Sequence, residues 1–477
     1  CFHEGILPYL PTIFSERPKM LRTQKTFFVI SVFLLSSFIL SCSFTDNSDN
    51  NEQNQETSED LPQDYSEEKT ESPDTEEPAP ELPEMYKTFV LSEEELISTE
   101  IPTVFIETQE QQQILSKEDW LSATMEIANS PDESWNFEPI DISIRGRGNC
   151  TWGQAKKPFA IKLSKKQSIC GMPKHKRWVL IANYLDNSFL KNSSAFILSE
   201  MLEMDYTVRG EFVNLVLNGN YVGLYWLGEA IKVDSKRVNI NEDEDFLIEM
   251  DVYFDETWKF KSSVKNLPYN IKNDDLMTDE RLENLKGKIT ELENILYSEN
   301  FPYADENKNA YESSFVNHID VESFAKFYLV NEIMHNGELG HPKSCYFTFD
   351  NSNSFLKAGP VWDFDWAGNA APQTLCYKNT IYYDVLFKTE SFNEQLKSLV
   401  AGISTDDYLE KMEALREKIS KSAELDGKRW GTEFRNPVGA KQANFDAYVD
   451  DLENIVVTKI VFAEKISKPI QTKEITA

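Results

Sequence analysis

Cysteine, basic residues and long apolar runs are all scarce in this sequence. Six cysteines among 477 residues do not make a disulfide framework, and the four in the part expected to fold are predicted to be buried free thiols: Cys150, Cys170, Cys345 and Cys376. Lys and Arg number 48 against 80 Asp and Glu, a formal net charge of −32. This balance argues against binding to nucleic acid through phosphate neutralisation. The apolar run Phe27–Leu40 has fourteen residues, too few for a comfortable membrane span of about 20.

The negative charge is concentrated in one segment. Ser43–Glu84 holds fifteen acidic residues and one basic residue, Lys69, so it carries −14 and leaves about −18 for the rest of the chain. The segment is rich in Asn, Gln, Ser, Glu and Pro and almost free of aliphatic residues. Such a composition cannot bury enough surface to fold, so residues 43–84 are predicted to form a disordered acidic tether.

A targeting segment precedes this tether. From Met20, a charged start with Arg22 and Lys25 leads into the apolar run and then to Ser41-Cys42, the pattern of a signal peptide. The ending resembles a bacterial lipoprotein processing site, which implies that Cys42 is acylated and becomes the new N-terminus. Residues 1–19 are expected to be upstream sequence and residues 20–42 a lipoprotein-type signal peptide. An ordinary secretory signal and an uncleaved anchor remain alternatives, and each of the three takes the chain out of the cytoplasm. The predicted location is the bacterial cell envelope, on the surface or the periplasmic face, with secretion as the alternative.

Residues 85–477 read as an α+β domain, because short alternating segments and helical periodicities both occur in them. Ile140–Ile144 and Phe159–Leu163 alternate as strands do, and Phe212–Leu227 reads as a hairpin with Asn-Gly at its tip. Further segments have helical spacing, and the last two are expected to close the structure: 185–204, 275–300, 321–335, 406–423 and 445–466.

The segment Trp362-Asp-Phe-Asp-Trp366 carries the strongest chemical signal. It is expected at the end of an apolar strand, where two carboxylates between large aromatic residues cost several kcal/mol to bury without a cation. A divalent ion is the simplest partner for Asp363 and Asp365. A pair of surface or helix-capping aspartates is the alternative.

Two more residues fit phosphoryl transfer, which needs a cation for phosphate, a carboxylate for Mg²⁺ and an acid that orients the nucleophile. Lys162 lies inside the apolar strand 159–163 and is a candidate for binding phosphate. The alternative is that its side chain only extends to solvent. Glu338 follows the apolar helix 321–335 and precedes a strand pair that leads to Asp363, 25 residues later. The order of helix, acidic loop, two strands and Asp-Phe-Asp is that of a protein kinase's catalytic loop and metal-binding segment.

Several separate motifs within residues 140–370 resemble the CotH kinase family. They are Arg145-Gly-Arg-Gly-Asn-Cys-Thr-Trp152, Lys156-Lys-Pro-Phe-Ala-Ile-Lys162, Trp178–Tyr184 with Asp186, Asn218–Tyr225 with Glu229, Asn331-Glu332, Pro342-Lys-Ser344 and Gly359–Asp365. The resemblance implies a bilobal atypical protein-kinase-like fold with C-terminal helices. It also implies use of ATP and Mg²⁺ or Mn²⁺ to phosphorylate Ser or Thr of extracytoplasmic proteins.

The resemblance also implies roles for individual residues. Lys162 contacts ATP phosphates, Asp363 binds metal and Asp365 is a second metal carboxylate. Glu338 stands where the family often has an Asp as catalytic base, and its extra methylene places activity in question, because small misplacements cost around 100-fold. Lys343 steadies the transferred phosphoryl group, with a salt bridge as the alternative.

For two further residues, both a role in nucleotide binding and a purely structural role remain possible. Arg147, with Arg145, meets phosphate or holds its loop to an acidic partner. Glu229 lies near the nucleotide or pairs with a structural cation.

Two other functions remain open. A catalytically inactive surface protein would keep the kinase-like shape for adhesion or envelope assembly. A metal-dependent hydrolase would use His335, Glu338 and His341, but their spacing and the intervening glycines do not suit a continuous zinc helix.

Overall fold

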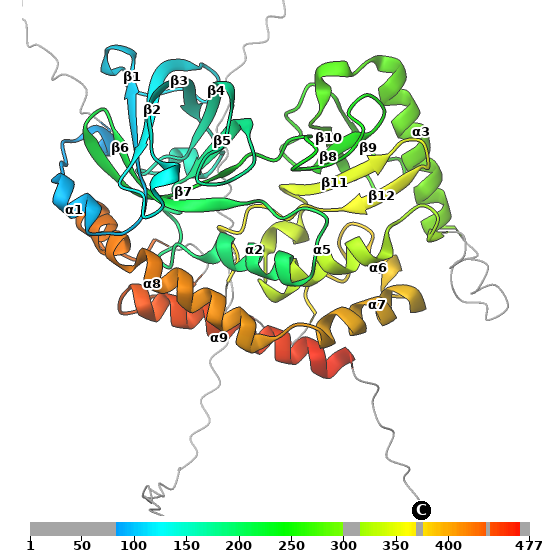
Figure 1. Ribbon diagram of the computed structural model, residues 1–477. Coiled ribbons are helices and arrows are strands. Elements are labelled where there is room, and N and C mark those ends of the chain that lie inside the picture. Colours follow the sequence, from blue (N-terminus) through cyan, green and yellow to red (C-terminus); the bar gives the residue numbers. More distant parts are fainter. Residues whose placement is uncertain (1–82, 299–314, 369–374, 436–438, 468–477) are drawn as a thin grey trace, which may run out of the picture. The chain divides into compact units, whose positions relative to one another are not determined.

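Two β-sheets organise the part of the chain that the structure, a computed structural model, describes: residues 83–298, 315–368, 375–435 and 439–467 (Figure 1). All of these residues belong to one compact unit, residues 72–477. The predicted signal peptide, its upstream residues and nearly all of the predicted tether lie outside the described residues, as does Cys42. Within the described residues, no helix combines the length and apolarity needed to cross a membrane.

The first sheet is a closed barrel of seven strands in the order β1-β2-β3-β4-β5-β7-β6. Neighbouring strands are antiparallel except β1 and β6, which run parallel and close the barrel. The strands are β1 (Thr103–Thr108), β2 (Leu121–Ala128), β3 (Phe137–Gly146), β4 (Phe159–Gln167), β5 (His175–Ile181), β6 (Gly210–Leu217) and β7 (Asn220–Glu229).

The second sheet is antiparallel, with the order β12-β11-β8-β10-β9. Its strands are β8 (Phe246–Met250), β9 (Lys259–Lys261), β10 (Pro268–Ile271), β11 (Cys345–Asp350) and β12 (Phe355–Ala358).

Eight α-helices accompany the two sheets in the described residues. They are α1 (Glu93–Ile97), α2 (Lys191–Met201), α3 (Asp279–Leu296), α5 (Val321–Ile333), α6 (Tyr383–Leu386), α7 (Glu390–Ala401), α8 (Thr405–Trp430) and α9 (Phe445–Ser467). The predicted α+β class is therefore confirmed. The closed seven-stranded barrel is a feature that the sequence did not predict.

Local signals explain most boundaries. The predicted hairpin forms β6 and β7, and its turn has the positive φ angles of 50° at Asn218 and 74° at Gly219 that an Asn-Gly turn permits. Asp320 caps α5 by accepting a hydrogen bond from the backbone N–H of Ser323.

Two predicted elements are shorter than expected. The helix predicted from residue 185 begins only at Lys191, because Asp186 accepts hydrogen bonds from the backbone N–H groups of Ser188 and Lys191 and holds a turn ahead of the helix. The strand predicted to lead into Asp363 ends at Ala358. Asp363 therefore lies in irregular backbone beyond the sheet.

Separate apolar cores fill the barrel and support the second sheet. Ile144, Ile161 and Leu180 point into the barrel, which places Lys162 on the outer face of β4. The other core joins the second sheet to α2, α5 and the C-terminal helices. Within the described residues, none of the four cysteines forms a disulfide, as predicted; Cys170 and Cys345 are buried as expected, whereas Cys150 and Cys376 are only partly buried.

A buried ion pair anchors α8 to the barrel. Lys156 and Asp426 are fully buried, and the Lys156 ammonium donates to Asp426 Oδ2 and to the Leu224 carbonyl, each at 2.5 Å. The same Asp426 oxygen accepts the backbone N–H of Leu224 at 2.9 Å. Gly223 makes this approach possible, because a Cβ there would lie 2.4 Å from Asp426 Oδ2. Burial lowers the pKa of Lys156 to about 8, against the opposing effect of Asp426.

We expect Lys156→Met to lower the free energy of unfolding by about 3 kcal/mol, because it leaves a buried carboxylate without its cation. Adding Asp426→Asn removes that charge while keeping an acceptor for Leu224, so the double variant should be more stable than the two single effects predict. Urea unfolding of the four proteins measures the coupling. Single effects that simply add within about 0.5 kcal/mol would show that the pair is not coupled.

Candidate active site

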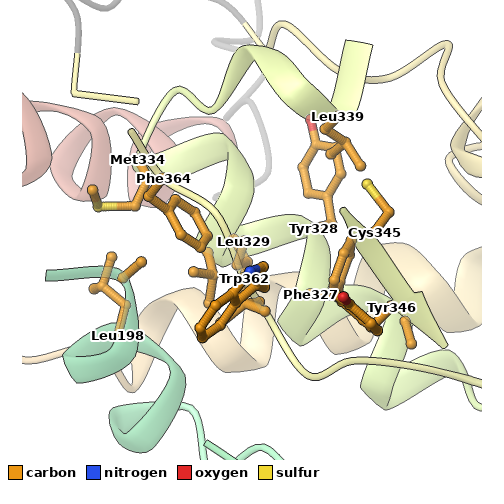
Figure 2. Close-up of a cluster of buried hydrophobic side chains, with 14 of the residues drawn as sticks. Leu198, Phe327, Tyr328, Leu329, Met334, Leu339, Cys345, Tyr346, Trp362 and Phe364 are labelled. Atoms are coloured by element: carbon orange, nitrogen blue, oxygen red, sulfur yellow. The ribbon is translucent and has the colours of Figure 1, made fainter. Parts of the chain in front are cut away.

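A strained turn in the backbone presents Asp363. Its φ angle is 64°, in a left-handed region that few residues other than glycine adopt, and such outliers gather at functional sites. The aromatic residues on both sides are buried: Trp362 is 9% exposed and Phe364 is fully buried. Figure 2 shows both rings among apolar side chains that include Leu198 of α2 and Leu329 of α5. The rings anchor the segment and leave the carboxylate between them.

Ser344 connects Asp363 to a second acid, Asp251. The Ser344 hydroxyl donates to Asp363 Oδ2 at 3.3 Å, and its backbone N–H donates to Asp251 Oδ2 at 3.4 Å. Asp251 directly follows β8, the strand next to β11. The ends of the two strands therefore bring these carboxylates together.

The first turn of α2 holds Asp365. The Asn192 amide donates to Asp365 Oδ1 at 2.9 Å, and its oxygen accepts the backbone N–H of Phe364 at 3.0 Å. Lys191 donates to the Asp365 carbonyl at 3.3 Å. One asparagine thus fixes both the backbone of Phe364 and the carboxylate of Asp365.

Glu338 lies on a short 3₁₀ turn, Gly337–Gly340, that Asn336 ties to Asp363. The Asn336 amide donates to the Asp363 carbonyl at 3.2 Å, while its oxygen accepts the backbone N–H of Glu338 at 3.3 Å. Glu338 is only 8% exposed, and its Oε2 atom is buried without a hydrogen-bond partner among the described residues. A buried acceptor with no donor is costly, and its presence suggests that a ligand completes it.

The acids at this site disfavour one another's ionisation. Burial and, to a smaller extent, the nearby charge of Asp363 raise the pKa of Glu338 to about 7, against the opposing effect of Lys343. Burial raises the pKa of Asp251 to about 6. The pKa values of Asp363 and Asp365 are also raised, by burial in both cases and in Asp365 by the charge of Asp363. A cation at this position would relieve the repulsion.

Two cations predicted from the sequence lie beside these acids. The Arg147 Cζ atom lies 5.5 Å from the centroid of the Trp362 ring. Of the neighbouring charged groups, Asp363 has the strongest electrostatic effect on Arg147. The Lys343 Nζ atom lies 5.0 Å from the Tyr253 ring centroid, and Lys343 acts on both Glu338 and Asp363. Five predicted site residues are thus brought together: Arg147, Glu338, Lys343, Asp363 and Asp365.

Glu229 and Lys162 lie elsewhere. Glu229 is fully buried and accepts two hydrogen bonds of 2.9 Å from Arg209 and one of 2.9 Å from Tyr206, with Arg237 at 3.5 Å. These contacts match the structural alternative left open for it. Lys162 is exposed on the outer face of β4, directly opposite Arg177 of β5.

Sequence reasoning missed the residues that hold the acids in place. Asp251 had a signal, since it follows an apolar strand as Asp363 was expected to do. Ser344 lay in the motif Pro342-Lys-Ser344 without a role of its own. Asn192 and Asn336 had no signal, because an amide acquires its role only from the partner that folding brings to it.

The oxygen donors of Asp363 and Asp365 suit Mg²⁺ or Mn²⁺. No group of three or more His, Cys, Asp or Glu residues that could hold a metal ion occurs in the described residues. Mg²⁺ commonly binds through one or two carboxylates together with waters and substrate phosphates, so a carboxylate pair fits an ion that arrives with a nucleotide. The same finding leaves His335, Glu338 and His341 without the preformed centre that a metal hydrolase would need.

A separate polar cavity of about 510 Å³ lies away from this site. None of the sequence-predicted site residues lines it. Its lining includes Asn241, Asp245, Asp350 and Lys357.

Residues 142–459, about two thirds of the chain, match the model of a family described as CotH kinase protein. A search of curated proteins finds no match.

Proposed function

Because this chain belongs to the CotH kinase family, which indicates a kinase-like function, we propose that it transfers the γ-phosphate of ATP to Ser or Thr of an extracytoplasmic protein. The observation that carries the proposal is the meeting of Glu338, Asp363 and Asp365 at one point, with Arg147 beside them and a Glu338 oxygen left without a donor. Phosphoryl transfer needs little more than such positioning and charge.

Each residue has a defined task in this proposal. Asp363 and Asp365 would hold the divalent ion, which when bound neutralises charge on the phosphates. Glu338 Oε2 accepts the proton of the substrate hydroxyl while the oxygen of that hydroxyl attacks the γ-phosphorus. The bond from that phosphorus to the bridging β-phosphate oxygen breaks, and ADP leaves. Arg147 and Lys343 would provide positive charge beside the reacting group.

The proposal extends to the fold and the location. The barrel with Arg147 and Lys162 would serve as the small lobe of a bilobal kinase, and the second sheet with its helices as the large lobe. Acylation of Cys42 would hold the protein at the bacterial envelope by its lipid anchor, where its partners are extracytoplasmic proteins. These parts rest on the sequence of residues 20–42 and on the family's resemblance to kinases.

Incubation of the purified protein with γ-labelled ATP and Mg²⁺ or Mn²⁺ tests the proposal. We expect label on the protein itself or on an added protein mixture, together with a nucleotide-dependent rise in melting temperature. If neither appears, and Asp363→Ala behaves like the parent, the kinase proposal fails. The result would then favour the catalytically inactive envelope protein.

A further inference from the structure

A row of cations lies on the outer face of the barrel. Lys162 of β4 is directly opposite Arg177 of β5, so the two side chains share one face of the sheet. Arg145 of β3 and Arg177 both lie over the Trp120 ring, with their Cζ atoms 4.8 and 5.1 Å from its centroid. Stacking on one ring aligns the two guanidinium groups despite their like charge.

Lys232 follows β7 by three residues and interacts electrostatically with Arg177. Burial lowers the pKa of Lys232, the like charges of Lys272 and Arg177 act in the same direction, and Asp274 and Glu256 oppose the shift. Within the residues that the structure describes, Lys162, Arg177 and Lys232 have no carboxylate within ion-pair distance. Acids act on two of these cations without forming an ion pair, Asp275 on Arg177 and Asp274 with Glu256 on Lys232, but in each case less strongly than the neighbouring cations do.

The cationic row continues into the carboxylate site. Lys272 pairs with Glu249 of β8 at 2.8 Å, and Tyr346 of β11 lies directly opposite Glu249. Arg147 is acted on by Glu249 and Tyr346 as well as by Asp363. A ligand with several linked negative groups can therefore touch the cations at one end and the metal-binding acids at the other.

We infer that Arg177 and Lys232, together with Lys162, bind the phosphate chain of a nucleoside triphosphate and deliver its terminal phosphate to Asp363 and Asp365. The inference rests on the proposed function and adds two nucleotide-binding residues to it. Arginine suits the role because its planar guanidinium donates two parallel hydrogen bonds to a phosphate, and lysine supplies a compact charge.

Equilibrium binding of a fluorescent ATP analogue to the full chain, with Mg²⁺ present, tests this assignment. Arg177→Gln and Lys232→Gln should each weaken binding about tenfold, because each removes a charge-assisted contact to phosphate. Binding of adenosine should not change, since it has no phosphate. Lys176→Gln is the matched control, because Lys176 is exposed and adjacent to Arg177 on the same strand. Arg177→Lys keeps the charge but not the two parallel hydrogen bonds, so its affinity should lie between those of the parent and Arg177→Gln, which separates a lost contact from a misfolded barrel.

The outcomes separate this inference from the proposed function. If the parent binds the ATP analogue and both Gln variants bind it equally well, the assignment of Arg177 and Lys232 is overturned while the kinase proposal stands. The assignment is also overturned, and the kinase proposal also stands, if the variants keep their nucleotide affinity but lose affinity for an acidic peptide. The cations would then form a surface that binds the protein substrate. If the parent binds no nucleotide, both the inference and the kinase proposal fail.

Discussion

Replacing Asp363 with Asn should reduce phosphoryl transfer by about 1,000-fold and leave the fold intact. Asn keeps the size of the side chain and an oxygen that can accept from Ser344, but it removes the charge that would hold the divalent ion. The buried charge of Asp363 also repels Asp365 and Glu338. Its removal should therefore not lower the melting temperature of the metal-free protein, and relief of the repulsion should raise it.

Steady-state transfer rates and melting curves, measured on the same preparations, test this pairing of effects. A matched control is Asp350→Asn, because Asp350 ends β11 and its carboxylate accepts local hydrogen bonds from Asn353 and from the backbone of Ser352. It should leave the transfer rate unchanged. Undiminished transfer by Asp363→Asn would remove Asp363 from the mechanism, and a marked drop in melting temperature would mean that its role is structural.

Glu338→Gln should lower the transfer rate by about 100-fold or more, the usual contribution of a general base. Gln is isosteric with Glu but cannot accept the hydroxyl proton, and it leaves the Asn336 contacts to the backbone of Glu338 and Asp363 in place. ATP binding should be nearly unchanged. Glu338→Asp should keep measurable activity, because the carboxylate is retained with a shorter reach.

The pH profile gives an independent check on Glu338. Its pKa is raised to about 7, and only the deprotonated carboxylate can accept a proton. The rate should therefore rise with increasing pH through that pKa and fall as the group becomes protonated below it. Glu338→Gln should lack this rise. A Gln variant that retains the parent's rate and its pH profile would assign the proton transfer to another group.

The sequence predicted the secondary structure near the site better than it predicted the site. The helix at Val321–Ile333 and the hairpin at Gly210–Glu229 were expected, because apolar periodicity and an Asn-Gly turn are local properties of the chain. The order of acids along the chain also singled out Glu338, Asp363 and Asp365, which the structure brings together. Glu229 shows the limit of reasoning from motifs. Its position in a motif could not reveal that its carboxylate accepts hydrogen bonds from Arg209 and is therefore not available to a nucleotide.

The sequence by itself determined the α+β class, the concentration of acid in residues 43–84 and the identity of the candidate acids. Only the tertiary structure decided that the first sheet closes into a barrel, that Asn192 holds Asp365 from 173 residues away, and that Arg177 shares a face of the barrel with Lys162. The reason is physical: periodicity and charge are written along the chain, whereas the burial and neighbours that set a carboxylate's pKa or leave a cation unpaired exist only after distant segments have packed.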